Sequence, residues 1–109
     1  MKSIYIAGPY SAGSKKQIDA NIHSAAKVAS YYAKRGYAVF CPHTMMTQID
    51  REFNGDGVLT WQYYLETDIY WLSKCDAVHM LRGWRDSKGA SLEYMVAKAL
   101  GLEILGEIT

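Results

Sequence analysis

The strongest constraint on the fold is an alternation of short apolar segments with longer helical patterns. Each apolar segment is rich in β-branched or aromatic residues and is bounded by glycine, proline or polar residues, which is typical of a buried strand. The predicted strands are Ser3–Ala7, Tyr37–Cys41, Ala77–Leu81 and Leu102–Leu105. The stretches between them are long enough to form helices, so the pattern predicts successive β-α-β units and a parallel sheet.

Capping residues mark the predicted helices. Ser14 precedes Gln17 by three residues, as in a capping box, and Thr60 is a plausible N-cap. The predicted helices run from Ser14 to Gly36, from Thr60 to about Ser73, and from Gly89 to Gly101. Between the first two, Asn54–Gly57 predicts a turn or mobile loop.

Right-handed crossovers between these units predict one α/β domain over residues 1–109. The expected fold is a small doubly wound parallel sheet, Rossmann-like or flavodoxin-like, with strand order 2-1-3-4. The switch point then lies between strands 1 and 3, where the loops Gly8–Gly13 and Leu81–Gly89 meet. Open α/β sheets bind ligands at such a point, so a small-molecule site is expected there.

Composition excludes several other functions. The net charge is +1 without a basic or acidic block, which argues against a nucleic-acid surface but not against a small phosphorylated ligand. Cys41 and Cys75 form neither a disulfide framework nor a metal spacing, and His43 and His79 have no second ligand at metal spacing. We therefore expect no metal and no cofactor. With neither a signal peptide nor a membrane-spanning run, a cytoplasmic protein is expected.

Glu93 is the first candidate for chemistry. It follows Gly89 by four residues and is expected in the first turn of the third helix, facing the sheet. Such an acid can simply complement the helix dipole, but one on the inner face above a cleft favours a functional role. The helix N-terminus would keep the carboxylate ionised, as a nucleophile requires.

Two further acids leave alternatives open. Asp68 interrupts the apolar stripe of the second helix, where a lone buried carboxylate is costly unless it is paired or used. A slightly rotated helix would instead place Asp68 at the margin of the stripe. Asp76 precedes the third strand, and its position alone favours a turn or capping acid.

The Gly8–Gly13 loop has the composition of a phosphate cradle without either common nucleotide pattern. It lacks the G-x-G-x-x-G fingerprint and the Gly-Lys-Ser/Thr of a P-loop. Trp84, beside Gly83, is either a lid over the core or a stacking surface for a base.

Taken together, several motifs resemble the nucleoside 2-deoxyribosyltransferase-like superfamily, and most closely its DUF4406 branch. The matching segments, in order, are IYIAGPY (4–10), Asn21, CPH (41–43), CDAV (75–78), GWRDSKGASLE (83–93) and AKALG (97–101). The match spans nearly the whole chain.

This resemblance implies roles for particular residues. In the superfamily a glutamate four residues after a loop glycine attacks the anomeric carbon of a nucleoside, and Glu93 with Gly89 fits that position. A first-strand tyrosine, here Tyr5, hydrogen-bonds the glutamate. An acid eight residues before the aspartate that opens the third strand contacts the sugar or base, which fits Asp68 and Asp76.

One departure from the pattern concerns the substrate. Transferases acting on unphosphorylated nucleosides carry Asp six residues before the glutamate, whereas the branch that hydrolyses deoxynucleoside 5′-monophosphates has Ser there, as this chain does at Ser87. A hydroxyl and main-chain N–H groups would bind a phosphate that an Asp would repel. Ser11, Gly13 and Ser14 would complete the cradle, although the neighbouring Asp86 can restore the acid.

A second departure concerns the C-terminus. In both enzyme branches a segment after the fourth strand helps to complete the neighbouring subunit's site, and we expect that segment to be short or missing in this chain.

The expected function is therefore hydrolysis of an N-glycosidic bond, or 2-deoxyribosyl transfer, on a (deoxy)nucleoside 5′-monophosphate. Glu93 is the expected nucleophile and Tyr5 orients it, while a second acid, Asp68 or Asp76, is expected to bind the sugar or base. Tyr10 and Trp84 would wall the base pocket beside Gly8. The alternative is a nucleotide-binding sensor or sponge that uses the same pocket without turnover. A third possibility is an interaction domain built on the aromatic residues. The expected assembly is a homodimer formed through the helices.

Overall fold

The fold is built on a four-stranded, all-parallel sheet. The computed structural model describes residues 1–45 and 59–107, so the turn predicted at Asn54–Gly57 lies outside the described residues. The strands are β1 (Ser3–Ala7), β2 (Ala38–Phe40), β3 (Ala77–Met80) and β4 (Glu103–Gly106). Their spatial order is β2-β1-β3-β4, which confirms the predicted order and the α/β class.

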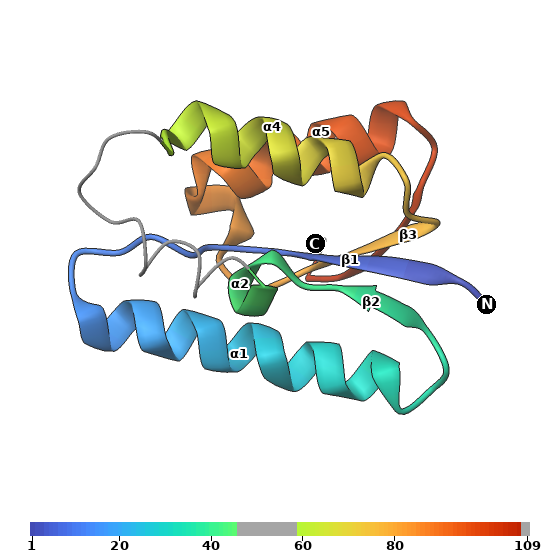
Figure 1. The fold of residues 1–109 in the computed structure, drawn as a ribbon, viewed down its shortest axis with the longest axis horizontal. Helices are drawn as coiled ribbons and strands as arrows, with labels where there is room; N and C mark the ends of the chain where they lie inside the picture. The colour runs from blue at the N-terminus through green and yellow to red at the C-terminus, as the bar shows by residue number, and fades with distance from the viewer. Residues whose placement is uncertain (46–58, 108–109) are drawn as a thin grey trace.

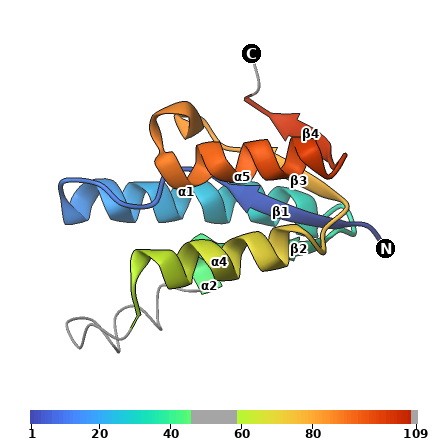
Figure 2. The same ribbon diagram turned by 90° about the horizontal axis from the view of Figure 1, so that it is seen from above.

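Helices cover both faces of this sheet (Figures 1 and 2). One face carries α1 (Lys15–Ala33) and the short α2 (Pro42–Met45). The other carries α4 (Trp61–Leu72), a 3-10 turn at Trp84–Asp86, and α5 (Lys88–Ala99). All connections between parallel neighbours therefore cross over through helices, as a doubly wound sheet requires.

Strand β1 lies in the interior of the sheet and carries apolar side chains on both faces. Ile4 and Ile6 pack into the core beneath α1, whereas Tyr5 and Ala7 join the core beneath α4 and α5. All four are buried, as expected for a strand covered by helices on both sides. Since alternate residues point to opposite faces, this register directs the one polar group of the set, the Tyr5 hydroxyl, toward α5.

The three long helices begin with the same type of N-cap, a hydroxyl side chain that accepts a hydrogen bond from the backbone N–H three residues later. Ser14 accepts from Gln17 at 3.2 Å, which confirms the predicted cap. Thr60 caps α4 at the same distance, and Ser87 caps α5 through Ala90 N–H. Each cap satisfies an N–H that the helix itself cannot pair.

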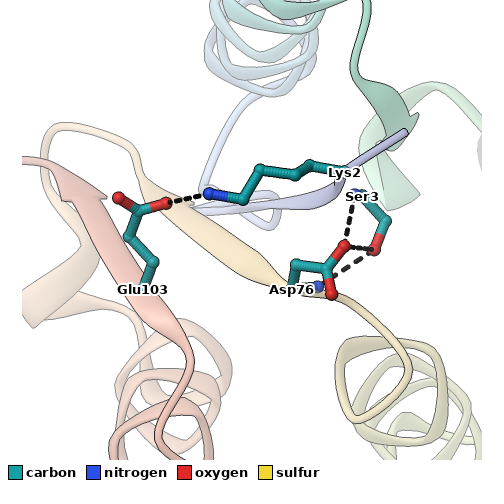
Figure 3. A network of polar contacts seen from close by, with 4 residues as sticks. All are labelled: Lys2, Ser3, Asp76 and Glu103. Atoms are coloured by element: carbon teal, nitrogen blue, oxygen red, sulfur yellow. Dashed lines mark hydrogen bonds and ion pairs between the residues drawn. The ribbon is translucent and has the colours of Figure 1, made fainter.

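The amino-terminal edge of the sheet is fastened by a polar network (Figure 3). One oxygen of Asp76 accepts hydrogen bonds from Ser3 N–H at 2.8 Å and Ser3 Oγ at 3.1 Å, and Asp76 N–H donates to Ser3 Oγ at 3.0 Å. Beside it, Lys2 forms an ion pair with Glu103 at 3.3 Å. Together these contacts hold the starts of β1, β3 and β4 in register.

At the opposite, carboxyl edge, the loops after β1 and β3 approach each other closely. A Cβ atom added to Gly8 would lie 2.5 Å from Leu81 Cβ, too close for any real contact. Gly8 does not have a positive φ, so glycine is required here by the lack of space for a side chain and not by the backbone conformation.

Among the described residues, no helix is both long and apolar enough to cross a bilayer.

We predict that Gly8→Ala destabilises the fold by about 1 to 3 kcal/mol, because the added methyl group must push the Leu81 segment away. The matched control is Gly13→Ala in the same loop, where an added Cβ meets nothing within 4 Å. Urea unfolding of the two variants measures the difference. Equal midpoints for both would contradict the close approach.

Candidate active site

A cavity of about 920 Å³ opens at the carboxyl edge of the sheet. Its walls come from the loops after β1 and β3, the first two turns of α4, and the start of α5. These segments gather at one end of the molecule (Figure 1), where the predicted switch point between β1 and β3 lies. The cavity is thus located where open α/β sheets bind ligands.

Glu93 lies at the floor of this cavity and is only 6% exposed. The buried face of α5 carries Ala90 and Ala97 on either side of it, and these small side chains let the helix pack close to the sheet. Tyr5, from β1, donates a hydrogen bond from its hydroxyl to Glu93. This is the contact that the family resemblance implied.

Burial raises the pKa of Glu93 to about 8, because the charged form loses its hydration. The Tyr5 hydrogen bond opposes this shift, and the nearby Asp68 adds to it. The expectation that the helix N-terminus keeps Glu93 ionised is therefore wrong. Since α5 begins after the Ser87 cap, Glu93 belongs to the second turn, where the helix dipole has weakened.

Tyr5 is held rigidly as a proton donor. Its ring stacks on Phe40 at 5.7 Å between centroids, and Phe40 stacks in turn on Trp71 at 5.3 Å. Burial, then the charge on Glu93, raises the pKa of the phenol well above its ordinary value. The hydroxyl therefore keeps its proton and can stabilise a carboxylate on Glu93 without losing it.

Asp68 reaches the same cavity from α4, and burial raises its pKa to about 6. The apolar stripe of α4, in which Asp68 was predicted to lie, has two parts with different surroundings. Trp61, Leu65 and Asp68 line the cavity, whereas Leu72, one turn further, is fully buried in the core. Asp68 is thus a partly buried acid facing a cleft.

Between about pH 6 and about pH 8 the two acids are in different states, with Glu93 protonated and Asp68 ionised. Two carboxyl groups whose environments separate their pKa values form the usual arrangement of an acid and a base on one substrate. The pair can therefore hold one proton in a position to be moved during a reaction.

The loop after β1 is attached to the cavity wall by two side chains. His43 forms a hydrogen bond to the Pro9 carbonyl at 2.8 Å, and the Asn21 amide donates to the Tyr10 carbonyl at 3.2 Å. The rings of Tyr10 and His43 meet edge-on at 5.7 Å. Both Asn21 and His43 line the cavity without having been assigned a site role from sequence, although both belong to the matching motifs.

Some of the remaining predicted site residues line the cavity, and others do not. Those that line the cavity are Gly8, Tyr10, Ser11, Ser87 and Gly89. Gly13 belongs to the same loop as Gly8 but is not part of the lining. Two cations that the sequence did not single out, Arg82 and Lys88, also line the cavity, as does Asp86.

Trp84 and Asp76 lie elsewhere. Trp84 is 7% exposed, stacks on Tyr94 at 4.5 Å, and donates its indole N–H to the Glu107 carbonyl. It covers the core and does not wall the cavity, so the expected stacking role is wrong. Asp76 is bound to Ser3 at the amino edge of the sheet, at the end opposite the cavity. The expectation that Asp76 binds substrate is therefore wrong, because its carboxylate joins the starts of β1 and β3 and does not line the cavity.

No group of three His, Cys, Asp or Glu side chains in residues 1–45 and 59–107 is arranged to hold a metal ion. The charged and polar side chains of the cavity instead include three carboxyls, two cations and several hydroxyls. This set suits an organic ligand that carries an anionic group.

Comparisons with known proteins agree with this fold. Residues 2–106 match the family model described as "Domain of unknown function (DUF4406)". A 2-desoxiribosyltransferase from Leishmania mexicana is similar in structure, with a TM-score of 0.62 and 22% identity over 97% of this chain and 63% of that one. This chain therefore spans less than two thirds of the Leishmania protein. The solution structure of BlsM gives a TM-score of 0.63 at 17% identity, covering 99% and 82% of the two chains. No curated protein matches the sequence.

We predict that Glu93 makes the free energy of unfolding fall as pH rises. The pKa of Glu93 is about 8 in the folded protein, above the ordinary value of 4.5. Its contribution to the free energy of unfolding is therefore complete below pH 4.5 and is lost as the pH rises through about 8. Between about pH 5 and about pH 8.5, the wild type should lose up to about 4 kcal/mol relative to Glu93→Gln.

Urea unfolding of both proteins at several pH values measures this difference. The comparison is needed because burial lowers the pKa of His43 and His79, which changes stability in the opposite direction in both proteins. Parallel stability curves for wild type and Glu93→Gln would show that Glu93 ionises normally.

Proposed function

We propose that this chain, which belongs to the DUF4406 family, cleaves or transfers the N-glycosidic bond of a deoxynucleoside 5′-monophosphate with Glu93 as nucleophile. The observation that carries the proposal is a buried glutamate on a cavity floor, hydrogen-bonded by a buried tyrosine and electrostatically coupled to a second acid. A structural glutamate has no need of a second acid facing the same cleft.

In the proposed reaction, a Glu93 oxygen attacks C1′ of the sugar while the bond from C1′ to the base nitrogen breaks. The bonding electrons leave with the base, which takes up a proton. Attack on the resulting glycosyl–enzyme ester by water releases 2-deoxyribose 5-phosphate, and attack by another base gives transfer. Either step restores Glu93.

The coupled acids can supply the proton that the base needs. If the proton of Glu93 moves to Asp68, the glutamate becomes a nucleophile and the aspartic acid becomes the donor to the base. Because burial raises the pKa of Glu93 further than that of Asp68, this transfer of the proton is uphill. The Tyr5 hydroxyl makes it less so, because it donates to the ionised glutamate.

The phosphate end of the substrate is proposed to lie at the start of α5. Ser87 and Gly89 line the cavity there, with Arg82 and Lys88 as the nearby cations and Ser11 from the loop after β1. A helix start with main-chain N–H groups and lysine or arginine is a common phosphate site. The Asp86 carboxylate on the same wall opposes this binding, which makes the two cations necessary.

A second candidate function is nucleotide binding without turnover, in a sensor or sponge. The burial of Glu93 favours it, because burial raises the pKa of this group to about 8 and a neutral carboxylic acid is a poor nucleophile. A nucleotide that co-purifies and survives incubation unchanged would identify this alternative.

Assembly and location complete the proposal. Apolar side chains are exposed at Met95 on α5 and at Leu100, its C-cap, and a homodimer through the helices would cover them. Free thiols at Cys41 and Cys75 are compatible with a cytoplasmic protein.

We predict that Glu93→Gln reduces base release from a panel of deoxynucleoside 5′-monophosphates by about a thousandfold or more, because an amide cannot form the glycosyl ester. Chromatography of free base measures the rate. The control is Glu66→Gln, an exposed acid on α4 whose carboxylate accepts a hydrogen bond from Gln62. Undiminished base release by a folded Glu93→Gln protein would exclude this nucleophile.

We predict that Ser87→Asp lowers kcat/KM for nucleotides by roughly 10- to 100-fold and leaves nucleosides unaffected, since the new carboxylate repels the 5′-phosphate. Aspartate caps a helix as well as serine does, so α5 should keep its start. Ser87→Asn, a neutral cap of the same size as Asp, is the control. An unchanged ratio of nucleotide to nucleoside activity would remove Ser87 from the phosphate site.

A further inference from the structure

We propose that Trp61 is the surface on which the base of the ligand stacks. This inference rests on the proposed nucleotide ligand and adds a binding residue to it. Trp61 lines the cavity and is 53% exposed, whereas Trp84 is buried in the core. Exposing a large aromatic ring to water is unfavourable, and a ligand bound in the cavity would cover the ring. The exposure of Trp61 inside the cavity therefore indicates a ligand at this position.

The position of Trp61 along α4 suits a nucleoside. Trp61, Tyr64, Leu65 and Asp68 all line the cavity, as residues at i, i+3, i+4 and i+7 share one helix face. Trp61 is the first residue of α4, and Asp68 follows two turns later, about 10 Å along the axis. An aromatic and apolar wall therefore leads from the cavity mouth to the acids. A base against Trp61 would place its sugar toward Asp68 and Glu93.

A lysine side chain lies over one face of the Trp61 indole ring. The Lys88 ammonium lies 5.1 Å from the ring centroid, as in a cation–π contact. Lys88 is exposed and flexible, so it can leave the ring when a base takes its place. Because Lys88 begins α5 beside Ser87, it remains within the region proposed for the phosphate.

Stacking of this kind recognises the class of ligand and not the identity of the base. Every nucleobase has a flat π-face, so one indole serves purines and pyrimidines alike. The ligand class is thus a planar heterocycle joined to an anionic sugar phosphate. Selection among bases would require hydrogen bonds from other groups.

Tyr70 provides a matched control on the same helix. It is 56% exposed, and the Lys74 ammonium lies 5.2 Å from its ring centroid, so it has nearly the same exposure and the same type of contact as Trp61. Tyr70 does not line the cavity. A substitution there removes an exposed aromatic ring of α4 that lies outside the cavity lining and packs edge-on against Trp71.

The experiment is calorimetric titration of Trp61→Leu and Tyr70→Leu, each in the Glu93→Gln background to prevent turnover. The probes are dAMP, dCMP and the base-free ligand 2-deoxyribose 5-phosphate. Trp61→Leu should bind both nucleotides about 10- to 100-fold more weakly and leave the base-free ligand unchanged. Tyr70→Leu should leave all three affinities unchanged, and Trp61→Phe, which keeps a smaller ring, should give an intermediate loss.

Equal nucleotide affinity in Trp61→Leu and Tyr70→Leu would overturn the stacking role while leaving the proposed reaction standing. An equal loss for nucleotides and for 2-deoxyribose 5-phosphate would also overturn it, since that result indicates a general collapse of the cavity. Failure of the Glu93→Gln parent itself to bind any of the three probes would overturn both the stacking role and the proposed function.

Discussion

The hydrogen bond between Tyr5 and Glu93 joins the centre of the sheet to the helix that covers it, and the rest of the site depends on it. It requires that β1 turn Tyr5 toward α5 while Ile4 and Ile6 face α1. It also requires alanines at positions 90 and 97, which allow α5 to come close enough. A change in strand register or in helix packing would therefore remove the site and the core contact together.

The sequence predicted the parts of the structure that depend on local pattern. Strand order followed from the alternation of elements, and the hydroxyl caps at Ser14 and Thr60 followed from residue type and spacing. The location of the cavity followed from the order of the strands. These features are set by backbone hydrogen bonding and by the period of apolar residues, both of which a single sequence displays.

What the sequence could not predict depends on three-dimensional packing. Whether Trp84 faces the core or the cavity depends on Tyr94 and Glu107, which local spacing does not connect to it. The charge state of Glu93 depends on how much water its surroundings exclude, and burial prevailed over the helix dipole. The inward face of α4 was predicted as an apolar stripe, but its first two turns border a cavity instead.

The pKa values of carboxyl groups are shifted in opposite directions at the two edges of the sheet. At the amino edge, the Ser3 N–H and hydroxyl donate to Asp76 and hold its pKa below the ordinary value. At the carboxyl edge, burial raises the pKa of Asp68 and of Glu93 above theirs. On acidification from alkaline pH, the site acids take up protons first, while the Asp76 clamp remains charged until the solution is far more acidic. The cavity acids and the acid that ties β3 to β1 therefore change their charge in separate pH ranges.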